Sequence, residues 1–177
     1  MDLADAVAEF RELDQRRTAG PLAPHEEERY QTLFLRLSDE LSGNERRRQF
    51  EGRRSLRVLC KLEVVLRTSD GGERMAKCAN FGGGGCAVRS AELFPMGSTV
   101  AIDGVLMTGI RYPLSCSAAI VWARPLTGGP NHDYGLQFAV ATPEIREQVE
   151  HIFYRAVDLF LKRRLFDASS RTIHWKK

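Results

Sequence analysis

The sequence predicts a mainly β protein with flanking α-helices: an antiparallel β-barrel or sandwich, with a helical hairpin before it and one helix after it. Three observations support this fold class. Apolar residues recur at helical spacing over residues 2–41, short runs rich in branched side chains fill residues 58–140, and helical spacing returns after residue 142. Because no helical pattern separates the strand-like runs, antiparallel pairing is favoured over a parallel α/β sheet.

Two N-terminal helices are predicted over residues 2–17 and 25–41. Each has an apolar stripe, formed by Leu3, Ala6, Phe10 and Leu13 in the first and by Tyr30, Leu33, Phe34, Leu37 and Leu41 in the second. Gly20, Pro21 and Pro24 interrupt the pattern, as expected where one helix stops and another starts. The short link predicts an antiparallel hairpin, which either packs on the rest of the chain or offers a surface to a partner protein.

Six short strands are expected in the middle of the chain. They cover residues 58–67, 73–79, 86–89, 99–107, 114–124 and 134–140. Turn residues separate them, including Ser-Asp-Gly-Gly at 69–72, which is typical of a hairpin. A glycine run at 80–85 is interpreted as a connection between strands. Trp122 and Phe138 fall within strands and are predicted to belong to the core.

A final helix is expected from Pro143 to a basic last turn at residues 162–164. Thr142 can cap this helix, and proline suits its first turn. Its apolar stripe is formed by Ile145, Val149, Ile152, Phe153, Ala156 and Phe160. We therefore divide the chain into a helical hairpin at 1–44, an arginine-rich linker at 45–57, a barrel with its C-terminal helix at 58–166, and a basic tail at 167–177.

The positive charge of the chain is small in total but concentrated in one segment. The 177 residues include 26 Lys and Arg against 23 Asp and Glu, a formal net charge of +3, which is too small to indicate nucleic-acid binding. The strands also lack the interleaved aromatic and basic side chains of nucleic-acid platforms. Residues 46–57, however, hold six arginines against one acidic residue, so this local basic segment is the feature to explain.

Several other classes of protein are not indicated. The sequence contains no nucleophile-elbow, zinc-protease or phosphate-loop motif, so we expect no enzyme. The four cysteines, at 60, 78, 86 and 116, have no C-x-x-C spacing and the histidines are scattered, so we expect no disulfide, metal or cofactor. Without a secretory signal or a membrane-spanning apolar run, the sequence predicts a cytoplasmic protein with reduced thiols.

Two polar motifs flank the first predicted hairpin. Arg53, Arg54 and Arg57 precede its first strand, whereas Asn80, Gly82 and Gly85 follow its second. In an antiparallel pair, the start of one strand lies beside the end of the next, so the two motifs should meet at one end of the sheet. Arginine binds phosphate and the guanine edge, glycines expose backbone N–H groups, and an asparagine amide both donates and accepts. This set of groups suits a small ligand that carries phosphates and guanines.

These motifs resemble those of the PilZ domain family, in which Arg-x-x-x-Arg is followed downstream by Asp/Asn-x-Ser-x-x-Gly. Here Arg53 and Arg57 have the required spacing, and Asn80 and Gly85 stand at the two ends of the second motif. The strand Tyr-Gly-Leu-Gln-Phe at 134–138 and the helix after it also look like the C-terminal part of that family. The resemblance covers about residues 45–165 and implies a six-stranded barrel that binds the bacterial second messenger cyclic di-GMP.

The resemblance also implies a role for each site residue. Arg53 and Arg57 would contact phosphate and guanine, Asn80 a guanine edge, and Gly85 would form a tight turn. Arg54 lies beside the first arginine. Gly82 stands where the family has serine and can offer only its backbone. The missing neutral hydrogen bond is worth about 1 kcal/mol, or roughly fivefold in affinity.

Two functions remain open at this point. In the first, the chain is a cyclic di-GMP receptor that transmits ligand binding to an unidentified protein partner through the arginine-rich linker and the helical hairpin. In the second, it is a PilZ-like adaptor that binds proteins and no nucleotide. The hairpin and the C-terminal helix would then hold the functional surface.

Overall fold

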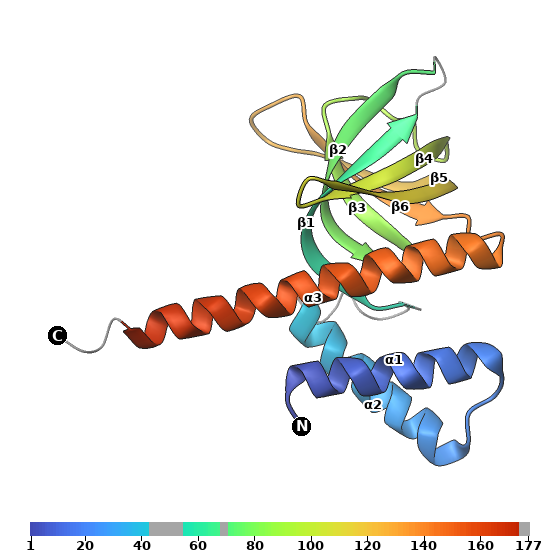
Figure 1. Ribbon diagram of the computed structural model, residues 1–177. Helices are drawn as coiled ribbons and strands as arrows, with labels where there is room; N and C mark the ends of the chain where they lie inside the picture. The colour runs from blue at the N-terminus through green and yellow to red at the C-terminus, as the bar shows by residue number, and fades with distance from the viewer. Residues whose placement is uncertain (43–54, 68–70, 174–177) are drawn as a thin grey trace. The chain divides into compact units, whose positions relative to one another are not determined.

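The computed structural model describes residues 1–42, 55–67 and 71–173, which include three helices and six strands (Figure 1). The described chain divides into two compact units. One consists of residues 1–56 and 159–177, and the other of residues 57–158. Arg53, Arg54 and most of the linker expected at 45–57 lie outside the described residues. Among the residues that the structure does describe, no helix is long and apolar enough to cross a membrane.

The first unit contains the expected helical hairpin, α1 (Leu3–Ala19) and α2 (Pro24–Leu41). Asp2 begins α1 by accepting a hydrogen bond from the Asp5 backbone N–H at 2.8 Å. The two predicted apolar stripes face each other, and the rings of Phe10 and Tyr30 stack with their centroids 4.8 Å apart. At the edge, the Arg29 Nε lies 2.6 Å from a Glu9 carboxylate oxygen, so the hairpin is held by buried rings and exposed ion pairs.

The second unit is a closed antiparallel barrel with the strand order β1-β2-β3-β6-β5-β4 (Figure 1). Its strands are β1 (Arg57–Arg67), β2 (Glu73–Gly82), β3 (Gly85–Ser90), β4 (Thr99–Met107), β5 (Ile110–Pro125) and β6 (His132–Phe138). Because β1 pairs with both β2 and β4, the sheet closes on itself and forms a barrel, not a sandwich. Inward-facing side chains such as Val58, Phe81 and Leu136 are completely or almost completely buried and form the core.

The glycine run at 80–85 was expected to be a connection between strands, and this is only partly correct. β2 continues to Gly82 and β3 starts at Gly85, so the connection between them is a tight turn. The run therefore contributes ladder positions on two neighbouring strands, in addition to the turn.

The C-terminal helix α3 (Pro143–Ile173) is longer than expected. We predicted its end near residues 162–164 and a basic tail at 167–177, but the helix continues through Ile173. The physical reason is that no glycine or proline occurs after residue 143, and basic residues favour a helix C-terminus without ending it. Its first part, up to Asp158, belongs to the barrel unit, where the Gln148 Oε1 accepts a hydrogen bond from the Ser115 N–H at 3.3 Å.

Candidate functional site

The β1–β2 hairpin places Arg57 directly opposite Gly82, and the β2–β3 ladder pairs Gly82 with Gly85. These three residues thus form one row across three neighbouring strands. They alternate with Val58, Phe81 and Cys86, a row that is completely buried inside the barrel. Because successive residues of a strand point to opposite faces, the row that starts at Arg57 lies on the outer face of the barrel.

Asn80 lies in the next row on the same outer face, two residues before Gly82 on β2. It pairs with Leu59 on one side and with Ala87 on the other. A register shift between Cys78 and Asn80 places Ala79 as an extra residue on β2 relative to β3. In a regular strand, residues two positions apart point to the same face. Cys78 faces the core, and the bulge at Ala79 therefore turns Asn80 to the opposite, outer face.

The Asn80 side chain is buried, with 9% of its surface exposed, and its Oδ1 has no hydrogen-bond partner within the described chain. An unsatisfied buried acceptor costs about 1–3 kcal/mol. The backbone carbonyl of the same residue is satisfied, since it accepts a hydrogen bond from the Cys78 thiol at 3.1 Å. The Oδ1 is therefore an unsatisfied acceptor below the surface of the described chain, and a ligand donor reaches it only when the atoms that cover it move.

The row of Asn80 continues across the sheet through Ala87, Gly135 and Trp122, on β3, β6 and β5. A Cβ atom at position 135 would lie only 2.0 Å from the Trp122 Nε1, so the indole packs directly on the glycine backbone. Trp122 is 37% exposed, and its expected place in the core is wrong; Phe138, at 6% exposed, does belong to the core. The indole thus offers an accessible ring in the same row as the buried Asn80 amide.

Small residues occupy the surface between Arg57, Asn80 and Trp122. We call the outer side of Gly82, Gly85, Ala87 and Gly135 the glycine face. Gly85 cannot be replaced freely, because its φ is +156° and a Cβ atom there would lie 2.0 Å from the Leu136 carbonyl oxygen. The result is a floor of residues with small or no side chains, all four of them buried in the described chain, so a flat ligand reaches it by displacing the groups that cover it.

Charged side chains border the glycine face beyond Trp122 and Ala87. Arg89 and Arg124 both bind the Asp133 carboxylate, at 2.8 and 3.1 Å, from the two strands beside it. The hydrogen bond from Arg89 is the main cause that holds the pKa of Asp133 below its ordinary value, with burial opposing it and Arg124 reinforcing it. Two guanidinium groups against one carboxylate leave this border positive, as a phosphate-bearing ligand requires.

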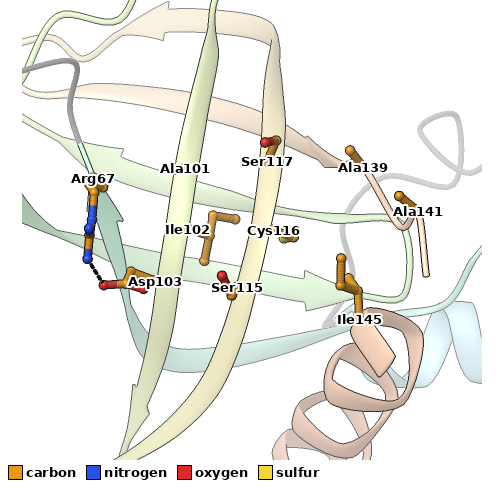
Figure 2. A pocket seen from close by; sticks show the side chains of 10 residues that line it. All are labelled: Arg67, Ala101, Ile102, Asp103, Ser115, Cys116, Ser117, Ala139, Ala141 and Ile145. Atoms are coloured by element: carbon orange, nitrogen blue, oxygen red, sulfur yellow. Dashed lines mark hydrogen bonds and ion pairs between the residues drawn. The ribbon is translucent and has the colours of Figure 1, made fainter. Parts of the chain in front are cut away.

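A second recess lies elsewhere on the barrel, and Figure 2 shows its lining. It has a volume of about 400 Å³, and we call it the α3 cavity because Ile145 of α3 closes one side. Its lining residues are Arg67, Ala101, Ile102, Asp103, Ser115, Cys116, Ser117, Ala139, Ala141 and Ile145. None of the ligand-binding residues predicted from the sequence lines it. Its charges are already paired, since Asp103 binds Arg67 and its backbone carbonyl accepts a hydrogen bond from Arg111 at 2.7 Å.

The thiols and the acidic residues give no sign of a metal centre. All four cysteines are free. Within the described ranges, no group of three His, Cys, Asp or Glu side chains could hold a metal ion. Three of the thiols nevertheless lie under the glycine face, on β1, β2 and β3: Cys60, Cys78 and Cys86.

Sequence reasoning missed Trp122 and Gly135, although one signal was present. A glycine inside an otherwise apolar strand often marks a place where another group approaches the backbone closely, and Gly135 is such a residue. The sequence does not show that Trp122 lies opposite Gly135, because β5 has a bulge between Ile120 and Trp122 that shifts its register.

The family model for the PilZ domain matches residues 45–155. The PilZ domain of YcgR from Escherichia coli with c-di-GMP is similar in structure, with a TM-score of 0.49, 12% identity, and coverage of 64% of this chain and 97% of that chain. MotI/DgrA, the inhibitor of motility of Bacillus subtilis, is similar with a TM-score of 0.47, 16% identity, and coverage of 59% and 50%.

The complex of MrkH from K. pneumonia with c-di-GMP has a TM-score of 0.47 and 14% identity, with 63% of this chain and 54% of that chain covered. This chain thus matches about half the length of MotI/DgrA and of MrkH. No curated protein matches it.

Proposed function

Because the chain belongs to the PilZ domain family, we propose that its glycine face is a receptor site for cyclic di-GMP. The observation that carries the proposal is the buried Oδ1 of Asn80, an acceptor without a partner in the described chain, beside Arg57 and the bare backbone of Gly82. The amino and imino N–H groups of a guanine base can satisfy that oxygen. Neither a sugar nor an apolar ligand combines such donors with a flat ring and phosphate groups.

The proposal gives each group a part of the ligand to bind. Guanidinium groups of Arg57 and, by their position in the sequence motif, of Arg53 and Arg54 bind phosphate and guanine oxygens. The indole of Trp122 stacks on a purine, an interaction worth about 1–3 kcal/mol per base. Gly82 and Gly85 leave room for the ligand to reach the backbone.

Transmission to a protein partner is the second part of the proposal. The arginine motif lies between α2 and β1 in the chain, so a ligand bound by these arginines holds the segment that joins the helical hairpin to the barrel. Ligand binding would then change the surface that the hairpin offers to a partner, by the logic of order–disorder and hinge switches. Hydrogen exchange in α2 with and without cyclic di-GMP tests this; unchanged exchange there would contradict transmission through the hairpin.

Calorimetric titration of the full chain with cyclic di-GMP tests the receptor proposal, with Asn80→Leu as the decisive variant. Leucine removes the unsatisfied oxygen at similar volume, so the variant should fold with equal or higher stability while cyclic di-GMP binds about fivefold more weakly, as for the loss of one hydrogen bond. Gln148→Leu, which removes an amide far from the motif, is the matched control and should bind like the parent. GMP serves as the ligand control.

Absence of heat with the parent chain at high micromolar nucleotide would end the receptor proposal. The adaptor function would then stand, and one observation favours it: Gly82 lacks the serine hydroxyl of the family motif. In that case, partners captured by the full chain should be the same with and without added nucleotide.

A further inference from the structure

The thiols of Cys60 and Cys78 lie next to each other beneath the candidate site. Cys60 is on β1 and Cys78 on β2, with 3.9 Å between their Sγ atoms. The ladder pairs Leu59 with Asn80 and Leu62 with Cys78, so Cys60 and Lys61 together lie opposite the single residue Ala79. Such a bulge leaves one residue unpaired and disrupts the ladder locally, so no regular pair of ladder hydrogen bonds holds the two strands at this point.

We infer that Cys60 and Cys78 form a reversible cross-strand disulfide, and that this bond switches the nucleotide affinity of the site. The second half of the inference rests on the proposed function, whereas the first half does not. A disulfide has an S–S distance of about 2.05 Å, so the two sulfur atoms need to approach by about 1.9 Å. Rotation of the two side chains about χ1 and movement at the bulge supply this approach.

The coupling to the site runs through Asn80. The Cys78 thiol donates its proton to the Asn80 carbonyl oxygen at 3.1 Å. When Cys78 enters a disulfide it loses that proton, so this hydrogen bond disappears. The Asn80 backbone then loses an anchor directly below the amide that the proposed ligand uses, and binding should weaken.

The oxidation is balanced with a peroxide as the oxidant. The more exposed thiol, Cys60, attacks hydrogen peroxide as its thiolate, giving a sulfenic acid and hydroxide. The Cys78 sulfur then attacks the sulfenic sulfur, which forms the S–S bond and expels a second hydroxide. The two hydroxides take up the two thiol protons and become two molecules of water. In total, two thiols lose two protons and two electrons, and one peroxide becomes two waters.

The environment of the thiols determines how fast this reaction is. The hydrogen bond between the two thiols and burial both raise the pKa of Cys60, and burial raises that of Cys78. Thiolate is therefore scarce at neutral pH, and we expect oxidation over minutes to hours. A reductant such as dithiothreitol returns both thiols.

Peptide mapping of the full chain, after peroxide treatment and blocking of the remaining thiols, tests the bond itself. We expect a cross-linked pair that contains Cys60 and Cys78, lost in Cys60→Ser and retained in Cys116→Ser. Cys116 is the matched control, because it is a buried thiol of the same barrel on β5, a strand that pairs with neither β1 nor β2. A bond to Cys86, or four free thiols after prolonged oxidation, would overturn the inference.

Titration with cyclic di-GMP before oxidation, after oxidation and after reduction tests the switch. We expect about fivefold weaker binding by the oxidised chain, as for the loss of one hydrogen bond, recovery on reduction, and no response to peroxide in Cys60→Ser. Unchanged affinity in a chain that carries the mapped bond would overturn the switch. A mapped bond in a chain that never binds nucleotide would instead contradict the proposed function and leave the disulfide established.

Discussion

The glycine face and the α3 cavity lie on the same barrel and differ in how their polar groups are satisfied. In the α3 cavity, Asp103 already binds Arg67, and the Ser115 N–H already donates to Gln148. At the glycine face, the Asn80 Oδ1 is buried without a partner in the described chain. A ligand in the α3 cavity would have to break existing pairs, whereas a ligand at the glycine face would complete one.

The volume of the α3 cavity alone therefore does not make it the better candidate site. The α3 cavity has a volume of about 400 Å³, but its charged residues already have partners. The glycine face combines an unsatisfied acceptor, a partly exposed indole and residues with small or no side chains. Four predictions test this comparison.

Gly85→Ala should have the largest effect, on stability. Its Cβ atom would lie 2.0 Å from the backbone oxygen of Leu136, so β3 and β6 must separate where they form the floor of the glycine face. We expect a loss of about 3 kcal/mol or more in the free energy of unfolding, measured by urea denaturation. Gly109→Ala is the control: its φ is also positive, at +80°, but a Cβ atom there meets open space, and about 1 kcal/mol should be lost. Equal losses in the two variants would mean that the close approach of β6 does not matter.

Arg57→Ala should have the largest effect on nucleotide binding. A charge-assisted hydrogen bond contributes about 1.5–3 kcal/mol, so cyclic di-GMP should bind about 10- to 100-fold more weakly. Arg67→Ala removes an arginine from the other end of the same strand, at the α3 cavity, and should leave the dissociation constant within about twofold. If calorimetry ranks the two variants the other way, the ligand lies in the α3 cavity.

Trp122→Ala should come next, because it removes the stacking surface. We expect binding to weaken by about tenfold, at the lower part of the range for base–aromatic stacking. Val121→Ala, at the exposed neighbouring residue, is the control and should change affinity little. Trp122→Phe should recover part of the loss. If Trp122→Ala binds cyclic di-GMP like the parent, the indole packs on Gly135 and takes no part in nucleotide binding.

Much of the fold could be predicted because it depends on local patterns. The helical hairpin follows from two apolar stripes with a proline-rich break, and the position of Arg57 opposite Gly82 follows from the antiparallel pairing of β1 with β2. The PilZ domain match at residues 45–155 agrees with the family that the two motifs indicated. In both cases, elements that follow each other along the chain also pack against each other.

The rest could not be predicted because it depends on distant pairing and on bulges. Trp122 was expected in the core because it falls within a predicted strand, and simple alternation along β5 would place it on the same face as the buried Ile120. The bulge between these two residues turns the indole outward, opposite Gly135 of β6. Likewise, the bulge at Ala79 turns Asn80 to the outer face of the barrel. Strand propensity cannot predict such a shift of the register by one residue.

Gly82→Ser should have the smallest effect, and it acts in the opposite direction. The substitution restores the hydroxyl of the family motif in the row of Arg57, and one added neutral hydrogen bond should tighten cyclic di-GMP binding about fivefold. Gly83→Ser places the same hydroxyl one residue further on, in the turn, and should leave affinity unchanged. Ser117→Gly removes a hydroxyl from the α3 cavity and should not change cyclic di-GMP affinity. Tighter binding by Gly82→Ser alone would place the ligand at the glycine face and not in the α3 cavity. Weaker binding by Gly82→Ser would mean that the ligand requires the bare backbone at this position, and that the glycine is an adaptation of this chain to a closer contact.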